Sequence, residues 1–490
     1  MGTPLIILSI IFLYFLVWVA VSYISSKGAD NATFFSGNRK MAWPLVAIAM
    51  MGAPITGVTF ISVPGMVVTK GYSYLQMCLG FIVGYVVIAF VLIPLYYRLR
   101  IVSIYGFLER RFGKTSSQTG AWLFFVSKLI GISVRFLVVC AMLQFLVFDP
   151  LGIPFAANVA VSLLLVWVTT YKGGVRSVIW GDVLKSLCLL SAIGLSLYFL
   201  LEAMGTNLPD IFSRITAHPS SRIFYLDDPA DPRYFWKQFV AGVFIVIAMT
   251  GLDQDMMQRA LACKDAKASR KNMISASLMQ VAVISCLLLL GSVMAMYMES
   301  LGETIPEKTD NIFATVAFHE GIPLVLGCLF IVGIVSATYS SVASALTSMT
   351  TAVTMDILPS PSVGSERPLN RRRIVVHASL AILMAILVMM FYYLNRDDAI
   401  STVYTLISYT DGPILALFLF GLLSRRQVNL RALPVVCMLA PVLSFAIQWG
   451  AERYFMYHIS YELLLINSGF TYLGLLLFSY RPALALDMEP

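Results

Sequence analysis

The chain has 490 residues, of which 59% are hydrophobic and only 12% are charged, and its formal net charge is +8. Its mean hydropathy of +0.83 lies far outside the range of soluble globular proteins. These values exclude a soluble domain and predict a polytopic membrane protein whose solvent is the lipid bilayer. The excess of basic residues marks one membrane face and does not indicate a nucleic-acid partner.

The apolar segments predict an all-α fold with about 13 transmembrane helices, since a spanning helix needs roughly 20 mainly apolar residues. The first segment lacks the basic start and the small-residue cleavage site of a signal peptide, so we expect it to be retained. The approximate cores are 4–24, 41–64, 71–97, 117–148, 154–170, 177–204, 236–260, 272–298, 320–356, 374–394, 399–423, 432–450 and 459–479. We therefore expect one transmembrane domain over 1–490.

Lys and Arg residues concentrate in alternate loops, for example 98–114 and 259–271. Such loops remain on the cytoplasmic side of a membrane. The sequence therefore predicts an integral protein of the cell membrane with its amino terminus outside and its carboxyl terminus in the cytoplasm.

Proline and glycine interrupt three of the predicted spans: Pro54 in the second, Thr250-Gly251 in the seventh and 411–413 in the eleventh. Inside lipid, irregular backbone persists only where protein or a water-filled cavity satisfies its polar groups. Breaks in the second and seventh spans favour a binding site near the membrane midplane. The alternative is that Gly and Pro are simply common in membrane helices.

The order of the spans predicts an inverted repeat. Residues 41–204 and 236–423 hold five segments each and begin on opposite sides of the membrane. The two predicted breaks then fall in the opening helix of each half, which is typical of 5+5 inverted-repeat transporters. Segment 4–24 is an extra amino-terminal helix, and 432–479 forms two carboxyl-terminal helices.

The ninth span carries a stripe of hydroxyl groups at Ser340, Ser344, Thr347 and Ser348, with the spacing of one helical face. Hydroxyl and carbonyl oxygens are the ligands that a hard cation prefers. The alternative is that these small residues only permit close helix packing.

Two charged residues inside the spans favour a function. Asp182 lies near the inner end of the sixth span, where a carboxylate is costly and usually functional; the alternative is a structural pair with Lys185 or Arg176. Arg135 lies in the middle of the fourth span, and its planar guanidinium suits the carboxylate of an acidic solute. The alternative is an internal ion pair with Asp182, Asp253 or Asp411.

Other charges near the inner face have structural interpretations. We expect Lys128 to reach the interface or bond a carbonyl. Asp253 and Asp255 precede Arg259 and a basic loop, and we expect them to pair with these cations. A phosphate-binding glycine loop, a nucleophile triad and a metal motif are absent from the sequence, so we do not expect an enzyme.

Several motifs in the same order resemble the sodium:solute symporter family: 109–113, the run 173–182 that ends in Asp182, 253–265, and Ser340-Ser341. The resemblance covers nearly the whole chain. It implies the leucine-transporter-type fold, alternating access, and sodium as the coupling ion.

The same resemblance implies a set of ion ligands. The sodium site would consist of backbone carbonyls and hydroxyls of Gly52, Ile55, Ala337, Ser340 and Ser341. A second sodium would use Asp182 and Ser344 together with Ser340, although Ala343 stands where a further hydroxyl is expected. Asp411 stands where glycine is common.

Within this family, Arg135 resembles the carboxylate-binding arginine of the sialic-acid transporters. The other expected substrate contacts are Thr56, Thr59, Tyr74 and Gln76. They predict an acidic organic solute, such as a carboxylated sugar.

Three alternatives stay open at the level of sequence. A proton-coupled symporter or an amino-acid or monocarboxylate symporter would share the fold, and a channel can also be lined with hydroxyl groups. No feature of the sequence specifies an oligomeric state.

Overall fold

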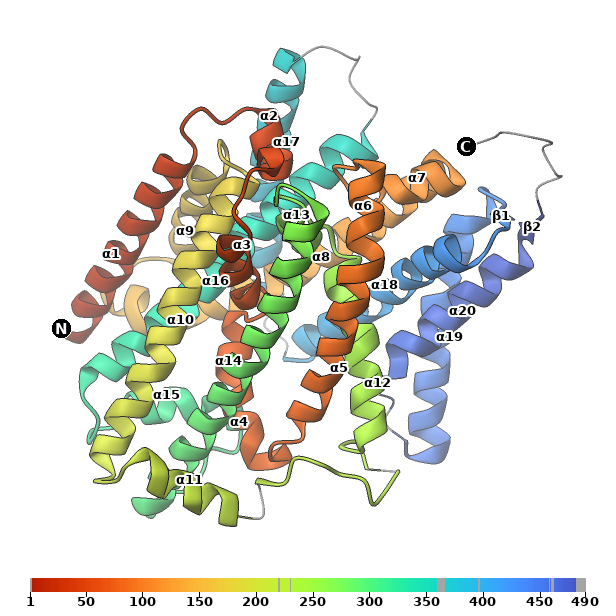
Figure 1. Cartoon of the computed structure of the whole chain (residues 1–490). Helices are drawn as coiled ribbons and strands as arrows, with labels where there is room; N and C mark the ends of the chain where they lie inside the picture. The colour runs from red at the N-terminus through yellow and green to blue at the C-terminus, as the bar shows by residue number, and fades with distance from the viewer. Residues whose placement is uncertain are drawn as a thin grey trace.

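A computed structural model of the protein describes residues 2–218, 221–229, 231–358, 366–394, 397–457, 459 and 462–481. Long helices lie side by side and account for almost all of the fold (Figure 1). The α-helices are α1 (Gly2–Ser25), α2 (Asn31–Ser36), α3 (Trp43–Gly52), α4 (Gly57–Lys70), α5 (Tyr74–Val87), α6 (Ile93–Leu99), α7 (Gly106–Phe112), α8 (Lys114–Leu143), α9 (Phe155–Thr170), α10 (Val175–Ala203), α11 (Leu208–Ala217), α12 (Phe235–Val246), α13 (Gln254–Ala260), α14 (Ala266–Ser300), α15 (Ile312–Ala317), α16 (Leu324–Ala352), α17 (Glu366–Leu394), α18 (Asp397–Leu423), α19 (Ala432–Phe455) and α20 (Glu462–Leu477).

Short helical turns and two short strands complete the fold. The π and 3-10 turns are η1 (Gly37–Arg39), η2 (Ile88–Leu92), η3 (Gln144–Phe148), η4 (Asp149–Leu151), η6 (Ile247–Gly251), η7 (Thr309–Asn311) and η8 (Val353–Ile357). Strands β1 (Gln427–Val428) and β2 (Ser479–Tyr480) pair antiparallel. This strand pair connects the segment before α19 to the segment after α20.

Among the described residues, eight helices are long and apolar enough to cross a membrane, or ten if two bent pairs each count as one span. Three shorter apolar helices lie at 155–170, 409–423 and 462–477. The predicted all-helical membrane fold is confirmed, whereas the count of thirteen spans stays a prediction.

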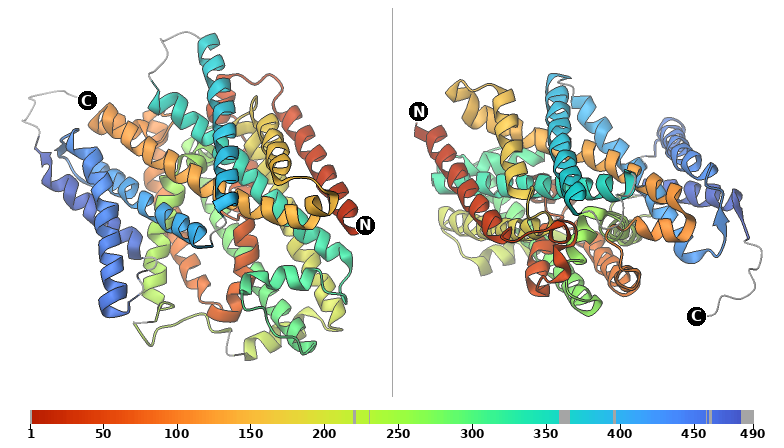
Figure 2. Two further views of the ribbon diagram at one scale, coloured as in Figure 1. Left: turned by 180° about the vertical axis from the view of Figure 1, so that it is seen from behind. Right: turned by 90° about the horizontal axis from the view of Figure 1, so that it is seen from above.

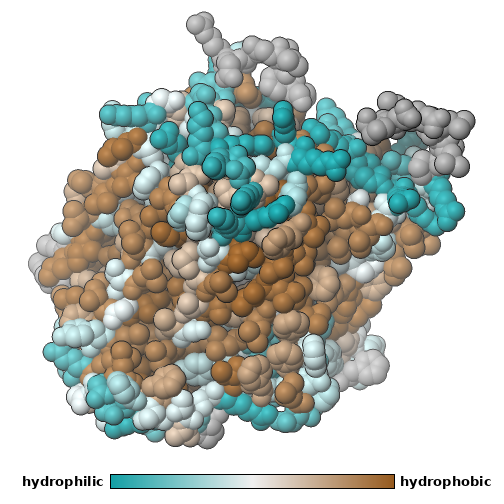
Figure 3. All heavy atoms as spheres, in the orientation of Figure 1, coloured by the Kyte–Doolittle hydropathy of each residue, from teal (hydrophilic) through white to brown (hydrophobic). Residues whose placement is uncertain are grey.

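Apolar and hydrophilic residues occupy separate zones of the surface, as expected of a protein that spans a bilayer. A broad apolar band crosses the molecule between two hydrophilic ends (Figure 3). Helices α2, α7 and α13, which adjoin the predicted cytoplasmic loops, lie toward one end, and α11 and α15 lie at the other (Figure 1). The basic loops therefore share one end of the molecule.

Helix α16 is the centre of the fold. About 78% of its apolar stretch is buried, against 28% for α17 and for α19. It packs against α8, α10 and α1, while α1 and the pair α19–α20 lie at opposite edges of the bundle (Figure 2). The hydroxyl stripe of α16 therefore faces protein and not lipid.

The predicted break in the second span is present. Helices α3 and α4 form a bent pair with an angle of 60°. Pro54 has no N–H to continue the ladder, and the Ile55 N–H instead donates to the Gly52 carbonyl at 3.0 Å. The Thr56 side chain accepts from the Thr59 N–H and so starts α4.

The seventh span is broken more sharply. The helix from Phe235 to Gly251 and α13 form an angle of 74°. Asp253 caps the new helix by accepting from the Met256 N–H at 3.1 Å. By contrast α18 continues through Pro413, so the proline of the eleventh span does not break its helix.

Candidate functional site

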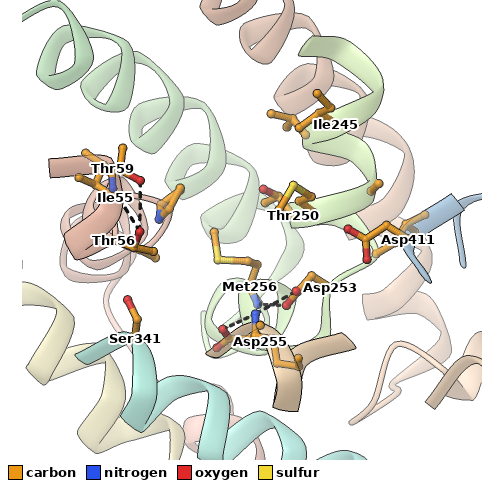
Figure 4. Close-up of a pocket in the computed structure, with 18 of the residues that line it drawn as sticks. Ile55, Thr56, Thr59, Ile245, Thr250, Asp253, Asp255, Met256, Ser341 and Asp411 are labelled. Atoms are coloured by element: carbon orange, nitrogen blue, oxygen red, sulfur yellow. Dashed lines mark hydrogen bonds and ion pairs between the residues drawn. The ribbon is translucent and has the colours of Figure 1, made fainter. Parts of the chain in front are cut away.

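The two broken helices meet at a cavity of about 300 Å³ (Figure 4). Its walls come from the α3–α4 break, α5, α8, the α12–α13 break, α14, α16 and α18. Ser341 and Asp411 lie on opposite sides of this space, with Thr56 and Thr59 close to the side of Ser341 (Figure 4). Segments far apart in sequence thus form one chamber at the helix breaks.

Four of the five predicted substrate residues line this cavity: Thr56, Thr59, Tyr74 and Arg135. Arg135 makes no hydrogen bond and no ion pair with any residue that the structure describes. Its expected internal partners are engaged elsewhere, except Asp411, which lines the same cavity and attracts Arg135 over a longer range. The guanidinium is therefore available to a solute.

The prediction for Gln76 is wrong. Gln76 does not line the cavity and is fully buried. Its amide donates to the Arg233 carbonyl at 2.8 Å and accepts from the Tyr225 N–H at 3.0 Å, so it fixes the segment between α11 and α12. In that segment the side-chain hydrogen bond from Arg233 holds the pKa of Asp231 below its usual range.

The predicted sodium ligands come from the α3–α4 break and from α16, against which α4 packs. Ile55 and Ser341 line the cavity, while Gly52, Ala337 and Ser340 are buried. The contact between the two elements is close, because a Cβ placed on Gly57 would lie 2.3 Å from Thr338 Oγ1.

These groups have the oxygen chemistry that an alkali ion requires. The Gly52 carbonyl accepts from the Ile55 N–H, and the Ala337 carbonyl accepts from the Ser341 hydroxyl at 2.7 Å. The Gly52 oxygen keeps a second lone pair, whereas the Ala337 oxygen also accepts the Ser341 N–H of its own helix, so sodium would take the place of the Ser341 hydroxyl proton there. Hard cations bind such oxygen sets, so the residues present fit sodium.

The prediction of a second sodium at Asp182 and Ser344 is not supported by the contacts of these residues. Asp182 accepts from the guanidinium of Arg259 at 2.7 Å and from the hydroxyl of Ser340. Ser344 donates instead to Asp255, which lies 3.3 Å from Arg259. The arginine supplies the positive charge between the two acids, and the structural partner of Asp182 is Arg259 rather than Lys185 or Arg176.

Lys128 also differs from the prediction. Its ammonium lies 3.0 Å from Asp253 and 2.8 Å from Asp255, so it forms ion pairs and does not bond a carbonyl or reach the interface. The expected pairing of Asp255 with Arg259 is present. These ion pairs connect α8 to the start of α13.

One residue of the site has a contact that the sequence interpretation missed. Lys185 is fully buried, and its ammonium donates to the Ser341 hydroxyl at 3.4 Å. Lys185 follows Asp182 by one helical turn, which suggested a local pair. Its contact with α16 spans 156 residues of sequence, so no local signal could have revealed it.

An all-helical fold with two broken spans around one cavity is typical of secondary transporters. The sequence model of the sodium:solute symporter family matches residues 34–434. The chain belongs to this family.

Known members are related to the chain at low identity. The human sodium/iodide cotransporter is 24% identical over 83% of this chain, which spans 63% of that protein's length. The sodium/sialic acid symporter NanT of Aliivibrio fischeri is 25% identical over 85% of the chain and 82% of its own length. SiaT of Proteus mirabilis, also a sodium/sialic acid symporter, is 23% identical over 89% of the chain and 88% of its own.

Solved structures show the same fold. A substrate-bound, outward-open Na⁺-coupled sialic acid symporter has a TM-score of 0.81 and 19% identity, covering 97% of this chain and 99% of the other. Mhp1, a nucleobase-cation-symport-1 family transporter, has a TM-score of 0.54 and 15% identity, covering 91% and 93%. These similarities confirm the predicted transporter fold.

Proposed function

We propose that the protein is a sodium-coupled symporter that brings a small carboxylated solute into the cell by alternating access. The observation that carries the proposal is Arg135, a guanidinium in the wall of a cavity formed by two broken helices, with no ion pair to a described residue. A carboxylate can accept two parallel hydrogen bonds from this group. Relatives that carry sialic acid support a carboxylated sugar as the solute.

Sodium is carried as a co-substrate in this proposal. Inward movement of one charge across 100 mV releases about 2.3 kcal/mol, before any concentration gradient is counted. The α3–α4 break and α16 present the oxygen atoms that would bind the ion, next to the chamber that would bind the solute. The basic end of the molecule would face the cytoplasm.

An uptake screen tests the proposal directly. Purified protein in liposomes is given labelled sialic acid, a neutral hexose, an amino acid or a monocarboxylate, with external sodium or with choline at fixed pH. We expect uptake of a carboxylated compound in sodium and its loss in choline. Undiminished uptake in choline contradicts sodium coupling, and uptake of the neutral hexose alone contradicts the proposed solute class.

The sodium site makes a separate prediction. Ser340→Ala or Ser341→Ala removes one hydroxyl ligand, worth about 1 kcal/mol, so the sodium concentration for half-maximal uptake should rise roughly fivefold or more. Ser336→Ala is the matched control, because among the described residues the Ser336 hydroxyl bonds only the Gly333 carbonyl of its own helix. Unchanged sodium dependence in both variants would remove the assignment.

A further inference from the structure

We propose that the ammonium of Lys185 competes with sodium for the predicted sodium site, so that the native chain binds sodium weakly. The inference rests on the proposed function, because it concerns the same ion site. In this proposal, Lys185 determines how tightly the site binds sodium.

The contact of Lys185 is with a predicted sodium ligand. Its ammonium is 3.4 Å from the Ser341 hydroxyl, and no part of the side chain is exposed. Ser341 already donates its proton to the Ala337 carbonyl, so it offers lone pairs toward Lys185. Sodium would bind through the same lone pairs.

The position of α10 places Lys185 beside both halves of the site. Helix α10 packs against α3 and α16. A Cβ placed on Gly52 would lie 2.3 Å from the hydroxyl of Ser186, the neighbour of Lys185 in the chain. The segment of α10 at Lys185 therefore touches the broken helix through Ser186 and touches Ser341 of α16 through Lys185.

The charges around the site are already balanced without sodium. Asp182 and Asp255 attract Lys185, and Arg259 repels it. The connected charges are three bases and three acids: Lys128, Lys185, Arg259, Asp182, Asp253 and Asp255. Arg135 and Asp411 on the cavity wall add one charge of each sign.

A sodium ion would therefore add an uncompensated positive charge to a largely buried group of residues. Two cations at a separation of a few Å repel strongly where water is scarce. If Lys185 were neutral, the same group would carry one negative charge, and sodium would neutralise it. The lysine thus opposes sodium by contact and by charge.

The test uses the full chain in detergent and two readouts that do not depend on transport. Binding of ²²Na⁺ and sodium-dependent thermal stabilisation are measured at constant ionic strength, with choline as the replacement ion. In Lys185→Gln we expect the half-saturating sodium concentration to fall by at least about tenfold, because a nearby like charge is removed. Lys185→Arg keeps the charge and should keep weak binding.

Lys271→Gln is the matched control, since Lys271 is exposed and lies outside the group; its sodium affinity should equal that of the native chain. Size-exclusion chromatography reports folding, and Lys185→Met replaces the glutamine variant if the latter does not fold. Equal affinity in native and variant protein, or weaker binding in the variant, overturns this inference and leaves the proposed function standing. Absence of sodium binding in both proteins contradicts both proposals.

Discussion

Replacing Arg135 with alanine is expected to abolish measurable uptake of the carboxylated solute. Arg135 lines the cavity and has no ion pair with a described residue, so a bound carboxylate in the variant would lose the guanidinium of Arg135 as its partner. Truncating one member of a buried charge pair costs about 2–5 kcal/mol. This corresponds to a decrease in solute affinity by a factor between roughly thirty and several thousand. Labelled uptake at several solute concentrations, together with direct binding, measures the effect.

Two further variants test whether the loss of uptake is specific to the guanidinium of Arg135. Arg135→Lys keeps the charge but loses the planar fork, so its affinity should be intermediate. Arg214→Ala removes an arginine from α11, outside the cavity, and should transport normally. Full uptake by Arg135→Ala would contradict the assigned role.

Replacing Arg259 with methionine should cause the largest loss of stability. The guanidinium is 3% exposed and lies between the carboxylates of Asp182 and Asp255. Its removal leaves two buried acids with fewer partners, which costs about 3–5 kcal/mol for a buried ion pair. Thermal unfolding of the purified protein in detergent should show a large drop in midpoint.

The exposed pair between Arg222 and Asp227 supplies a matched comparison. Arg222→Met makes the same chemical change where water screens the charges, and exposed pairs contribute about 0–1 kcal/mol. Adding Asp182→Asn to Arg259→Met should restore part of the lost stability, because one orphaned charge is removed. A midpoint for Arg259→Met equal to that of Arg222→Met would contradict the structural role.

The helix breaks could be predicted because their causes are local. Pro54 removes a backbone donor wherever it is placed, and Gly251 ends a helical turn before a residue that can cap the next one. Pro413 shows the limit of this reasoning, since α18 accommodates it without a break. Packing around the proline decides that outcome, and packing is not a local property.

The partners of Lys128 and of Asp182 could not be predicted for the same reason. Lys128 and Asp255 are 127 positions apart, and Asp182 and Arg259 are separated by 77. Sequence spacing favoured near neighbours such as Lys185 for Asp182, because only these are brought together by one helix. Gln76 was misassigned on similar grounds, since its polarity was visible but its contact with the outer segment was not.

The short helix α13 has a mechanical consequence. An isolated helix of seven residues is far below the length of about 12–15 residues at which helices become even marginally stable in water, so α13 persists through its contacts. Its Asp255 carboxylate engages Lys128 of α8 and Ser344 of α16, and its Arg259 guanidinium engages Asp182 of α10. A 74° bend separates α13 from the preceding helix. Helix α13 therefore links α8, α10 and α16 through its side chains. A movement of α8 relative to α16 would stretch these contacts, and the bend would allow α13 to move without α12.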